Sequence, residues 1–342
     1  MSATLATTFR RRTSEPKVTR IGRSGDFGAI RDAIETVAAS LRMPTRSFPV
    51  LGPLDLRRTL APLSHGAGDP TIRLAANRVW RATRTSAGPA AMVLSHDGAT
   101  VDAEAWGPGA DCALAAVPDL LALATEPDDI PPGHPLVAEL ARRYPGVRVP
   151  RSRAIVDSLV PAILEQKVTG EAARRAWLGL LRSHGEPAPG PREWRLRLAP
   201  DAAVLARLPY YAYHPFGVER RRADLIRRVA ARAAWFEAIV DLPLPDAYAR
   251  LTAVPGIGPW TAAEVGVRAL GDPDAVSVGD FHLPNLVAYA LAREPRGTDA
   301  RMLKLLEPYR GQRARVVRLL ELSGIRAPRY GPRLSIQRID DR

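Results

Sequence analysis

The sequence predicts a mainly α-helical protein in which a small antiparallel α+β part precedes a helical core. Residues 46–106 hold β-branched and apolar runs around Asp97-Gly98, a dipeptide that favours tight hairpins. From residue 135 onward, apolar residues recur with helical spacing in successive stretches. With 342 residues, 46% of them hydrophobic, the chain can bury a sizeable core, and its length indicates two or three domains.

Proline and glycine clusters divide the chain into predicted parts. Residues 1–20 are basic, rich in hydroxyl groups and poor in acids, which indicates a flexible tail able to touch nucleic acid; an organellar transit peptide has a similar composition. A helix is expected at 111–124, and the prolines from Pro127 to Pro135 then open the helical core. A further exposed loop is expected at 184–191. The parts are a flexible N-terminal segment, a small β-rich α+β domain, an all-α core and a C-terminal tail (1–45, 46–126, 127–330 and 331–342).

The first core helices are predicted from one apolar face and one cap. Apolar residues recur at helical spacing from 155 to 163, and Thr169 is placed to cap the helix that follows. Between them lies the polar turn 166–168, Gln-Lys-Val. An exposed polar turn needs no function to explain it, so structural and functional interpretations both stay open.

A dense aromatic run at 208–217 precedes another predicted helix at 220–230. Aromatic side chains at this density just before a helix form a pocket wall or a minor-groove loop, or else pack in the core. The tyrosines and phenylalanine of the run are Tyr210, Tyr211, Tyr213 and Phe216. Several arginines are candidates for phosphate contacts or for ordinary solvated positions, namely Arg220, Arg221, Arg222, Arg310 and Arg313.

The most informative stretch is 251–264, in which Gly256 and Gly258 separate two apolar helical runs. Glycines allow a phosphate to approach bare backbone amides. Pro259 suits the first position of the second helix, whose N-terminal N–H groups point toward the same anion. Such a hairpin binds the nucleic-acid backbone without reading sequence. The alternative interpretation is an ordinary helix–turn–helix corner. The expected backbone contacts come from Pro255, Gly256, Ile257, Gly258 and Thr261.

A carboxylate follows at the entrance of the next predicted helix. Residues 276–291 consist of a short β-branched run, Gly279, Asp280 and an apolar helical stretch. Aspartate is a favoured N-cap, so capping explains Asp280 on position alone. Asp272 and Asp274 belong to a Gly-Asp-Pro-Asp turn and are interpreted as structural.

The composition predicts a type of partner and excludes several classes of protein. The formal charge of +13, from 49 basic and 36 acidic residues, predicts a polyanionic partner, either nucleic acid or an anionic membrane surface. Cys112 is the single cysteine, which excludes an internal disulfide and a four-cysteine cluster from this chain. No stretch reaches the roughly 18 apolar residues of a membrane helix, and the N-terminus lacks the apolar core of a secretory signal. We expect a monomer in the bacterial cytoplasm, associated with the nucleoid and without membrane contact.

Together these motifs resemble the helix-hairpin-helix DNA glycosylase superfamily. A glycine hairpin, a helix and an aspartate at the head of the next helix occur there in this order. The resemblance extends to residues 161–177, 220–230 and 307–322, so it covers most of residues 150–325. The β-rich part before the core is similar to that of the alkylpurine branch, the 3-methyladenine DNA glycosylase II type.

The resemblance implies a role for each candidate residue. Asp280 corresponds to the carboxylate that stabilises an oxocarbenium-like sugar while the N-glycosidic bond breaks. Trp260 takes the position where members that also cut the strand carry a Schiff-base lysine, and its face would stack on a cationic alkylated base. Gln166 or Lys167 corresponds to the residue that fills the gap left by an extruded nucleotide. The other implied pocket residues are Glu264, Tyr210, Tyr211, Tyr213, Phe281 and His282, and the implied phosphate contacts are Arg220, Arg310 and Arg313.

Two of these positions leave alternatives open. Glu264 stands where alkylpurine members place an aromatic residue, so it contacts an exocyclic amine or faces solvent, and lesion specificity is open. His282 repeats an Asp-x-His spacing found in several members, but it also suits an exposed position at a helix start.

The resemblance implies a monofunctional DNA glycosylase of base excision repair. Such an enzyme flips an alkylated purine of the 3-methyladenine type out of double-stranded DNA and hydrolyses its N-glycosidic bond, which leaves an abasic site. The alternatives are the same fold acting on a deaminated or oxidised base, and a noncatalytic DNA-binding protein. No cofactor is required, no histidine–cysteine cluster supports zinc, and a monovalent cation on the hairpin carbonyls is the metal that the resemblance allows.

Overall fold

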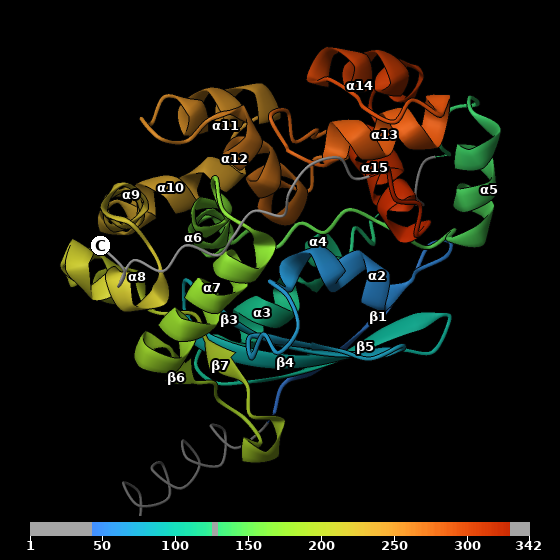
Figure 1. Cartoon of the computed structure of the whole chain (residues 1–342). Coiled ribbons are helices and arrows are strands. Elements are labelled where there is room, and N and C mark those ends of the chain that lie inside the picture. The colour runs from blue at the N-terminus through green and yellow to red at the C-terminus, as the bar shows by residue number, and fades with distance from the viewer. Residues whose placement is uncertain (1–42, 125–128, 329–342) are drawn as a thin grey trace, which may run out of the picture. The chain divides into compact units, whose positions relative to one another are not determined.

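The computed structural model describes residues 43–124 and 129–328 (Figure 1). The chain divides into two compact units, Met1–Met43 and Pro44–Arg342, and every described helix and strand belongs to the second. The predicted flexible segment and C-terminal tail therefore lie almost wholly outside the described residues. The four-part division of the chain stays a prediction.

A five-stranded antiparallel sheet forms the β-rich part that the sequence predicts. Its strands lie in the order β1-β5-β4-β3-β2. β4 and β5 are joined at Asp97-Gly98, where Gly98 has a φ of +109° and the Asp97 amide donates to the Thr100 carbonyl at 3.3 Å. The predicted hairpin is thus confirmed. The strands are β1 (Thr45–Pro49), β2 (Ile72–Leu74), β3 (Arg78–Thr85), β4 (Gly88–His96) and β5 (Thr100–Trp106).

Short helices cover one face of this sheet (Figure 1). They share with it a core in which Leu60, Leu94 and Leu114 are fully buried. These helices are α2 (Leu56–Leu60), α3 (Ala110–Ala115) and α4 (Val117–Leu120), with a 3-10 turn η1 (Ala61–Leu63) after α2.

The single helix expected at 111–124 is instead two short helices that break at Ala116. Pro118 explains the break, because proline has no amide hydrogen to donate and its ring clashes with the preceding helical turn. It is tolerated in the first turn of α4, where no such hydrogen bond is needed.

The helices from α5 onward pack in two clusters that lie side by side in Figure 1. The first surrounds α6, whose Ile155, Leu159 and Ile163 are fully buried, as their spacing predicts. The second joins α5 to α13, α14 and α15 around Met302 and Tyr309. The elements are α5 (Pro135–Arg143), α6 (Ile155–Glu165), α7 (Gly170–His184), α8 (Ala202–Arg207), η3 (Tyr210–Phe216), α9 (Arg220–Ala231), α10 (Ala233–Glu237), η4 (Ala238–Asp241), α11 (Leu244–Thr252), α12 (Pro259–Val265), the π-turn η5 (Gly266–Leu270), α13 (Leu283–Ala292), α14 (Asp299–Leu306), η6 (Glu307–Tyr309) and α15 (Arg313–Leu322).

The loop expected at 184–191 is partly docked rather than wholly exposed. It contains β6 (Glu186–Pro187), which pairs with β7 (Arg197–Leu198) across the turn η2 (Arg192–Trp194). Trp194 and Leu196 pack against alanines of the large sheet. Burial of apolar side chains just beyond the predicted loop therefore holds part of this loop against the sheet.

The two helical clusters meet beside the glycine hairpin. α12 belongs to the first cluster and α13 to the second. Asp272 accepts a hydrogen bond from the Tyr248 hydroxyl at 2.5 Å, and Asp274 accepts one from the Gly311 amide at 2.7 Å. Arg313 adds an ion pair to Asp274. Both aspartates fix this junction, so their structural interpretation is confirmed.

Candidate active site

The turn between α11 and α12 is the hairpin predicted from its glycines. Gly256 has a φ of +102°, and a Cβ there would lie 2.9 Å from Leu225 Cδ2, so both backbone and packing require glycine. Gly258 differs, since its φ is −93° and a Cβ there would meet nothing within 4 Å. Pro259 is the first residue of α12, as predicted. The helix α12 therefore starts directly after a glycine, so no side chain at position 258 covers its N-terminal amides.

The hairpin also contains two side chains that cannot serve as direct contacts. Ile257 is 3% exposed and Thr261 is 2% exposed. The apolar Ile257 side chain points beneath the turn and packs in the first helical core. These two residues can therefore offer a partner only their backbone.

Three donors hold Asp280 at the junction of the clusters. Its Oδ1 accepts hydrogen bonds from the His282 and Leu283 amides, at 2.7 Å each. Its Oδ2 accepts one from the Trp260 indole N–H at 3.1 Å. Asp280 thus caps the start of α13 and is also oriented by α12. The side chain is half-buried, so the carboxylate is fixed without being sealed from solvent.

The loop that carries Asp280 is hydrogen-bonded to Asp299 and exposes two aromatic rings to solvent. The Gly279 amide donates to both carboxylate oxygens of Asp299, at 3.1 Å each. Phe281 is 75% exposed, and its ring meets the exposed His282 ring edge-on at 4.9 Å. Both rings are therefore accessible beside Asp280, although their contact with substrate stays a prediction.

Gln166 supports the hairpin from the end of α6. Its amide nitrogen lies 3.0 Å from the Gly256 carbonyl and 2.9 Å from Thr261 Oγ1, and donates to both. Lys167, by contrast, is exposed and has a φ of +56° at the tip of the turn. Of the two candidates for the inserted side chain, Gln166 is tied to the hairpin and Lys167 is accessible.

A row of charged contacts continues from Trp260 through Glu264 of α12 to Arg268 of the π-turn η5. Glu264 Oε2 lies 2.9 Å from Arg268, and Glu264 Oε1 accepts a 2.5 Å hydrogen bond from Ser277. Arg268 also reaches Glu165 of α6, at 3.4 Å. The Glu264 side chain is 19% exposed, so the solvent-facing alternative for this residue is wrong. Only the four-residue spacing of Trp260, Glu264 and Arg268 signals this row in the sequence; Glu165 and Ser277 join it from other segments.

The two carboxyl groups of this row have shifted pKa values, raised for Glu264 and lowered for Glu165. Burial raises the pKa of Glu264, although Arg268 opposes it. Burial would also raise the pKa of Glu165, but Arg268 and the nearby His65 lower it below its ordinary value. Glu165 is therefore a carboxylate at neutral pH, stabilised by a buried guanidinium.

The aromatic run splits into core and surface. Tyr213 is fully buried and its hydroxyl donates to the Leu205 carbonyl at 2.9 Å, so the pocket role expected for it is corrected to core packing. Burial raises its pKa. Tyr211 is 62% exposed, and Arg220 lies 4.7 Å from the Tyr210 ring centroid. The turn η3 that carries them packs against α7 and α9, so Tyr210 and Tyr211 lie along the first cluster rather than on the Asp280 loop.

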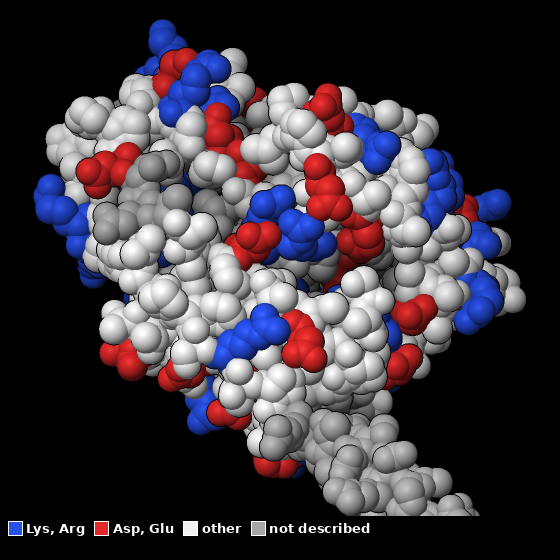
Figure 2. Space-filling model, turned by 180° about the vertical axis from the view of Figure 1, so that it is seen from behind, with Lys and Arg blue, Asp and Glu red and all other residues white. Residues whose placement is uncertain are grey.

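The candidate phosphate-binding arginines differ in availability. Arg222 is buried and donates to the Leu164 and Gly217 carbonyls, which makes it structural and corrects the expected contact. Arg313 is 18% exposed and engaged by Asp274. Arg220 and Arg310 keep 71% and 68% of their side chains exposed. On the face shown in Figure 2, basic and acidic side chains intermingle, so the net positive charge does not gather there as one patch.

The described residues hold no side-chain cluster for a metal ion, and the monovalent cation expected on the hairpin carbonyls stays a prediction. Within 43–124 and 129–328, no group of three or more histidine, cysteine, aspartate or glutamate side chains is placed to bind an ion. Two hairpin carbonyls already accept hydrogen bonds, Pro255 from Arg228 and Gly256 from Gln166.

In residues 43–124 and 129–328, no helix combines the length and apolarity needed to cross a bilayer.

Comparison with known proteins identifies the fold. No protein-family model matches the chain. A solved structure of a 3-methyladenine DNA-glycosylase from Archaeoglobus fulgidus matches with a TM-score of 0.68 and 16% identity, over 81% of this chain and 97% of that one. The chain has the helix-hairpin-helix glycosylase fold. An 8-oxoguanine glycosylase/lyase from Clostridium acetobutylicum shares this glycosylase fold, with a TM-score of 0.52 and 13% identity over 73% of this chain and 98% of that one.

One relative is similar in sequence as well. The probable bifunctional transcriptional activator/DNA repair enzyme AlkA of Mycobacterium tuberculosis is 31% identical over 142 residues, which are 41% of this chain and 28% of that protein. The chain thus matches less than a third of the length of that relative. The predicted fold class and the resemblance to the glycosylase superfamily are confirmed.

Proposed function

We propose that the protein is a monofunctional DNA glycosylase that removes alkylated purines from double-stranded DNA. The observation that carries the proposal is the geometry of Asp280. Its carboxylate is held from both sides and half-buried beside the glycine hairpin. A fixed negative charge stabilises a developing cation without having to reorganise during the reaction.

The proposed reaction breaks the bond between the base nitrogen and C1′ of the deoxyribose. The electron pair of that bond leaves with the base, and the sugar passes through an oxocarbenium-like state that Asp280 stabilises. Water then bonds to C1′ and releases a proton. An alkylated purine carries a positive charge on its ring and departs neutral, so no strong general acid is needed.

Trp260 supports the monofunctional form of the proposal. Glycosylases that also cleave the strand form a Schiff base with a lysine, and a tryptophan cannot do so. The sequence contains three lysines, Lys17, Lys167 and Lys304. Of the two in the described part of the chain, Lys167 is adjacent to Gln166, which contacts the hairpin. The relatives support DNA repair in general and include both a 3-methyladenine glycosylase and an 8-oxoguanine glycosylase/lyase.

The partner in this proposal is duplex DNA with a damaged base. The hairpin amides and exposed arginines such as Arg220 and Arg310 would contact phosphates, which position the duplex without reading its sequence. Accessible Lys167 would fill the gap left by the extruded nucleotide. The reaction needs no cofactor, and a monovalent cation on the hairpin carbonyls would serve only to bind phosphate.

The test is base release from methylated duplex DNA. We expect the protein to free 3-methyladenine or 7-methylguanine, detected by mass spectrometry. Asp280→Asn should slow release by about a hundredfold or more, because the charge is lost while the cap is kept. Asp111→Asn is the matched control, since that side chain is 80% exposed. Unchanged release by Asp280→Asn would refute the assigned role.

Two controls separate the alternatives. A substrate panel with hypoxanthine and 8-oxoguanine tests the deaminated and oxidised lesions. Tight binding to abasic DNA without release of any base would favour a noncatalytic DNA-binding protein. Borohydride should trap no covalent adduct; an adduct that disappears in Lys167→Ala would instead establish lyase activity.

A further inference from the structure

The segment that leads into Asp280 is fixed through Ser277 as well as through the aspartate itself. The Asp280 amide donates to the Ser277 carbonyl at 3.2 Å, and the Ser277 hydroxyl donates to Glu264 Oε1 at 2.5 Å. Ser277 is 8% exposed, so water has little access to this hydroxyl. Ser277 therefore connects the backbone of Asp280 to the Glu264 carboxylate.

One helix provides both contacts to this segment. Trp260 and Glu264 are four residues apart in α12, so they lie about one helical turn apart on the same face. Trp260 donates to the Asp280 side chain, and Glu264 accepts from Ser277, three residues earlier in the chain than the aspartate. Asp280 is thus held by its side chain and by its backbone from the same element.

Glu264 is itself fixed by a buried ion pair. Its Oε2 lies 2.9 Å from an Arg268 nitrogen, and the side chains of Glu264 and Arg268 are 19% and 13% exposed. A buried carboxylate costs free energy unless it is paired and hydrogen-bonded. Here Arg268 pairs with one oxygen and Ser277 with the other. Both oxygens of Glu264 therefore already have partners within the protein.

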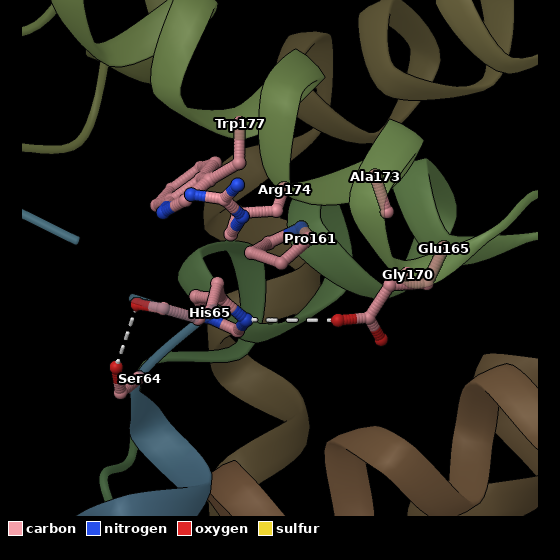
Figure 3. A pocket seen from close by; sticks show the side chains of 9 residues that line it. Ser64, His65, Pro161, Glu165, Gly170, Ala173, Arg174 and Trp177 are labelled. Atoms are coloured by element: carbon pink, nitrogen blue, oxygen red, sulfur yellow. Dashed lines mark hydrogen bonds and ion pairs between the residues drawn. The ribbon is translucent and has the colours of Figure 1, made fainter. Parts of the chain in front are cut away.

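The charged row has a second carboxylate at its other end. Arg268 also contacts Glu165 at the end of α6, at 3.4 Å. Glu165 faces a cavity of about 190 Å³ with walls from α6, α7 and the segment after η1, and His65 Nδ1 lies 3.9 Å from its Oε1 there (Figure 3). Loss of Glu165 would perturb the same guanidinium but leave the bond between Glu264 and the serine in place. Glu165 is therefore the matched control for Glu264.

We infer that Glu264 is a positioning residue for Asp280 and acts through Ser277. The inference rests on the proposed function. A carboxylate that stabilises a cationic transition state contributes most when it is already oriented before the reaction. Loss of Glu264 should therefore slow base release and leave DNA binding intact, because its contacts are with Ser277 and Arg268 rather than with the hairpin.

The first test removes the contact from each side. Glu264→Ala and Ser277→Ala should each lower the single-turnover rate of 3-methyladenine release by about tenfold, since a hydrogen bond to a charged group is lost. Affinity for duplex DNA with an abasic-site analogue should stay within about twofold, because the phosphate contacts are kept. Ser277→Ala removes only a hydroxyl, so it keeps the test decisive if Glu264→Ala does not fold. A wild-type rate in Ser277→Ala would overturn the inference.

Rescue by a conservative variant separates positioning from a role of the buried charge. Glu264→Gln keeps a hydrogen-bonding partner for Ser277, because either end of the amide can pair with a hydroxyl. We expect Glu264→Gln to release base within about threefold of the wild-type rate, whereas Glu264→Ala stays about tenfold slow. Equal rates in Glu264→Gln and Glu264→Ala would overturn the inference.

A double variant and the matched control complete the kinetics. Glu264→Ala combined with Ser277→Ala should be no more than about twofold slower than either single variant, because each removes the same contact. Glu165→Gln should change the rate by less than about threefold, because that contact is kept. Equal slowing by Glu165→Gln and Glu264→Ala would assign the effect to the charged row as a whole and overturn the role of Glu264.

An experiment without base release keeps the inference separable from the proposed function. Hydrogen exchange of the Trp260 indole N–H, assigned in NMR spectra by its absence from Trp260→Phe, reports whether Asp280 still accepts that hydrogen. Exchange that is about tenfold faster in Ser277→Ala than in wild type supports the positioning even if the protein releases no base. Equal exchange rates would overturn the inference, while the proposed function, tested by Asp280→Asn, would stand.

Discussion

At the scale of single residues, Asp280 shows how one side chain serves two purposes. One oxygen caps α13 through the His282 and Leu283 amides, and the other accepts the Trp260 indole hydrogen. Capping alone would need a single oxygen. The second contact comes from a different helix, which holds the carboxylate in one orientation across the junction of the two clusters.

The Trp260 contact leads to a prediction about rate. Trp260→Phe keeps an aromatic face but removes the N–H donor to Asp280. Because a hydrogen bond to a charged group contributes about 1.5–3 kcal/mol, we expect base release to slow by about tenfold or more, measured in single-turnover assays. Thermal unfolding and abasic-DNA binding should change little. A rate equal to that of the wild-type protein would mean that the indole N–H does not help to orient the carboxylate.

At the scale of elements, the hairpin combines one glycine required by the fold with one left open to a ligand. Gly256 is enforced by its φ of +102° and by Leu225 beneath it. Gly258 has ordinary backbone angles and empty space at its Cβ position. The intramolecular structure therefore does not explain Gly258, whereas the phosphate contact that we propose would.

The two glycines should separate stability from binding. Gly256→Ala should lower the free energy of unfolding by about 1–3 kcal/mol, from backbone strain and the contact with Leu225. Gly258→Ala should stay within about 0.5 kcal/mol of the unchanged protein but weaken binding to short duplex DNA by about tenfold. Urea denaturation and fluorescence anisotropy measure the two effects. If Gly258→Ala bound DNA normally, this glycine would not mark the point of phosphate approach.

At the scale of the whole molecule, buried carboxyl groups tie the elements together and link stability to pH. Glu237, at the end of α10, accepts hydrogen bonds from the Ile155 and Val156 amides, at 2.8 and 2.9 Å, and so caps α6. Burial raises the pKa of Glu237 to about 7, and the nearby Asp157 adds to the rise, although the two amides oppose it. Its ordinary value is 4.5.

The raised pKa of Glu237 predicts the direction of a pH effect. The folded protein binds this proton more tightly than the unfolded chain does, so the contribution to stability is complete below about pH 4.5 and is lost as pH rises through about 7. Glu237→Gln cannot ionise. Relative to that variant, the free energy of unfolding of the unchanged protein should fall by about 1–3 kcal/mol between pH 4.5 and 8, by urea denaturation. Parallel pH profiles for the two proteins would contradict the shift.

Local patterns made several features of the fold predictable. The turn at Asp97-Gly98, the apolar face of α6, the cap at Thr169 and the start of α12 at Pro259 depend on neighbouring residues, so sequence spacing reveals them. The break at Pro118 was missed even though proline signals it locally. The prediction that Asp280 stands at a helix entrance succeeded for the same reason.

The sequence by itself determined the order of elements, the hairpin with its glycines, and the aspartate at the head of α13, because each of these depends on residues a few positions apart. Only the tertiary structure decided which candidates face a ligand. It buried Tyr213 in the first helical core, joined Arg268 to Glu165, tied Gln166 to the hairpin and left Phe281 exposed. These outcomes depend on contacts between residues tens to hundreds of positions apart, and packing of distant segments leaves no periodic trace along the chain.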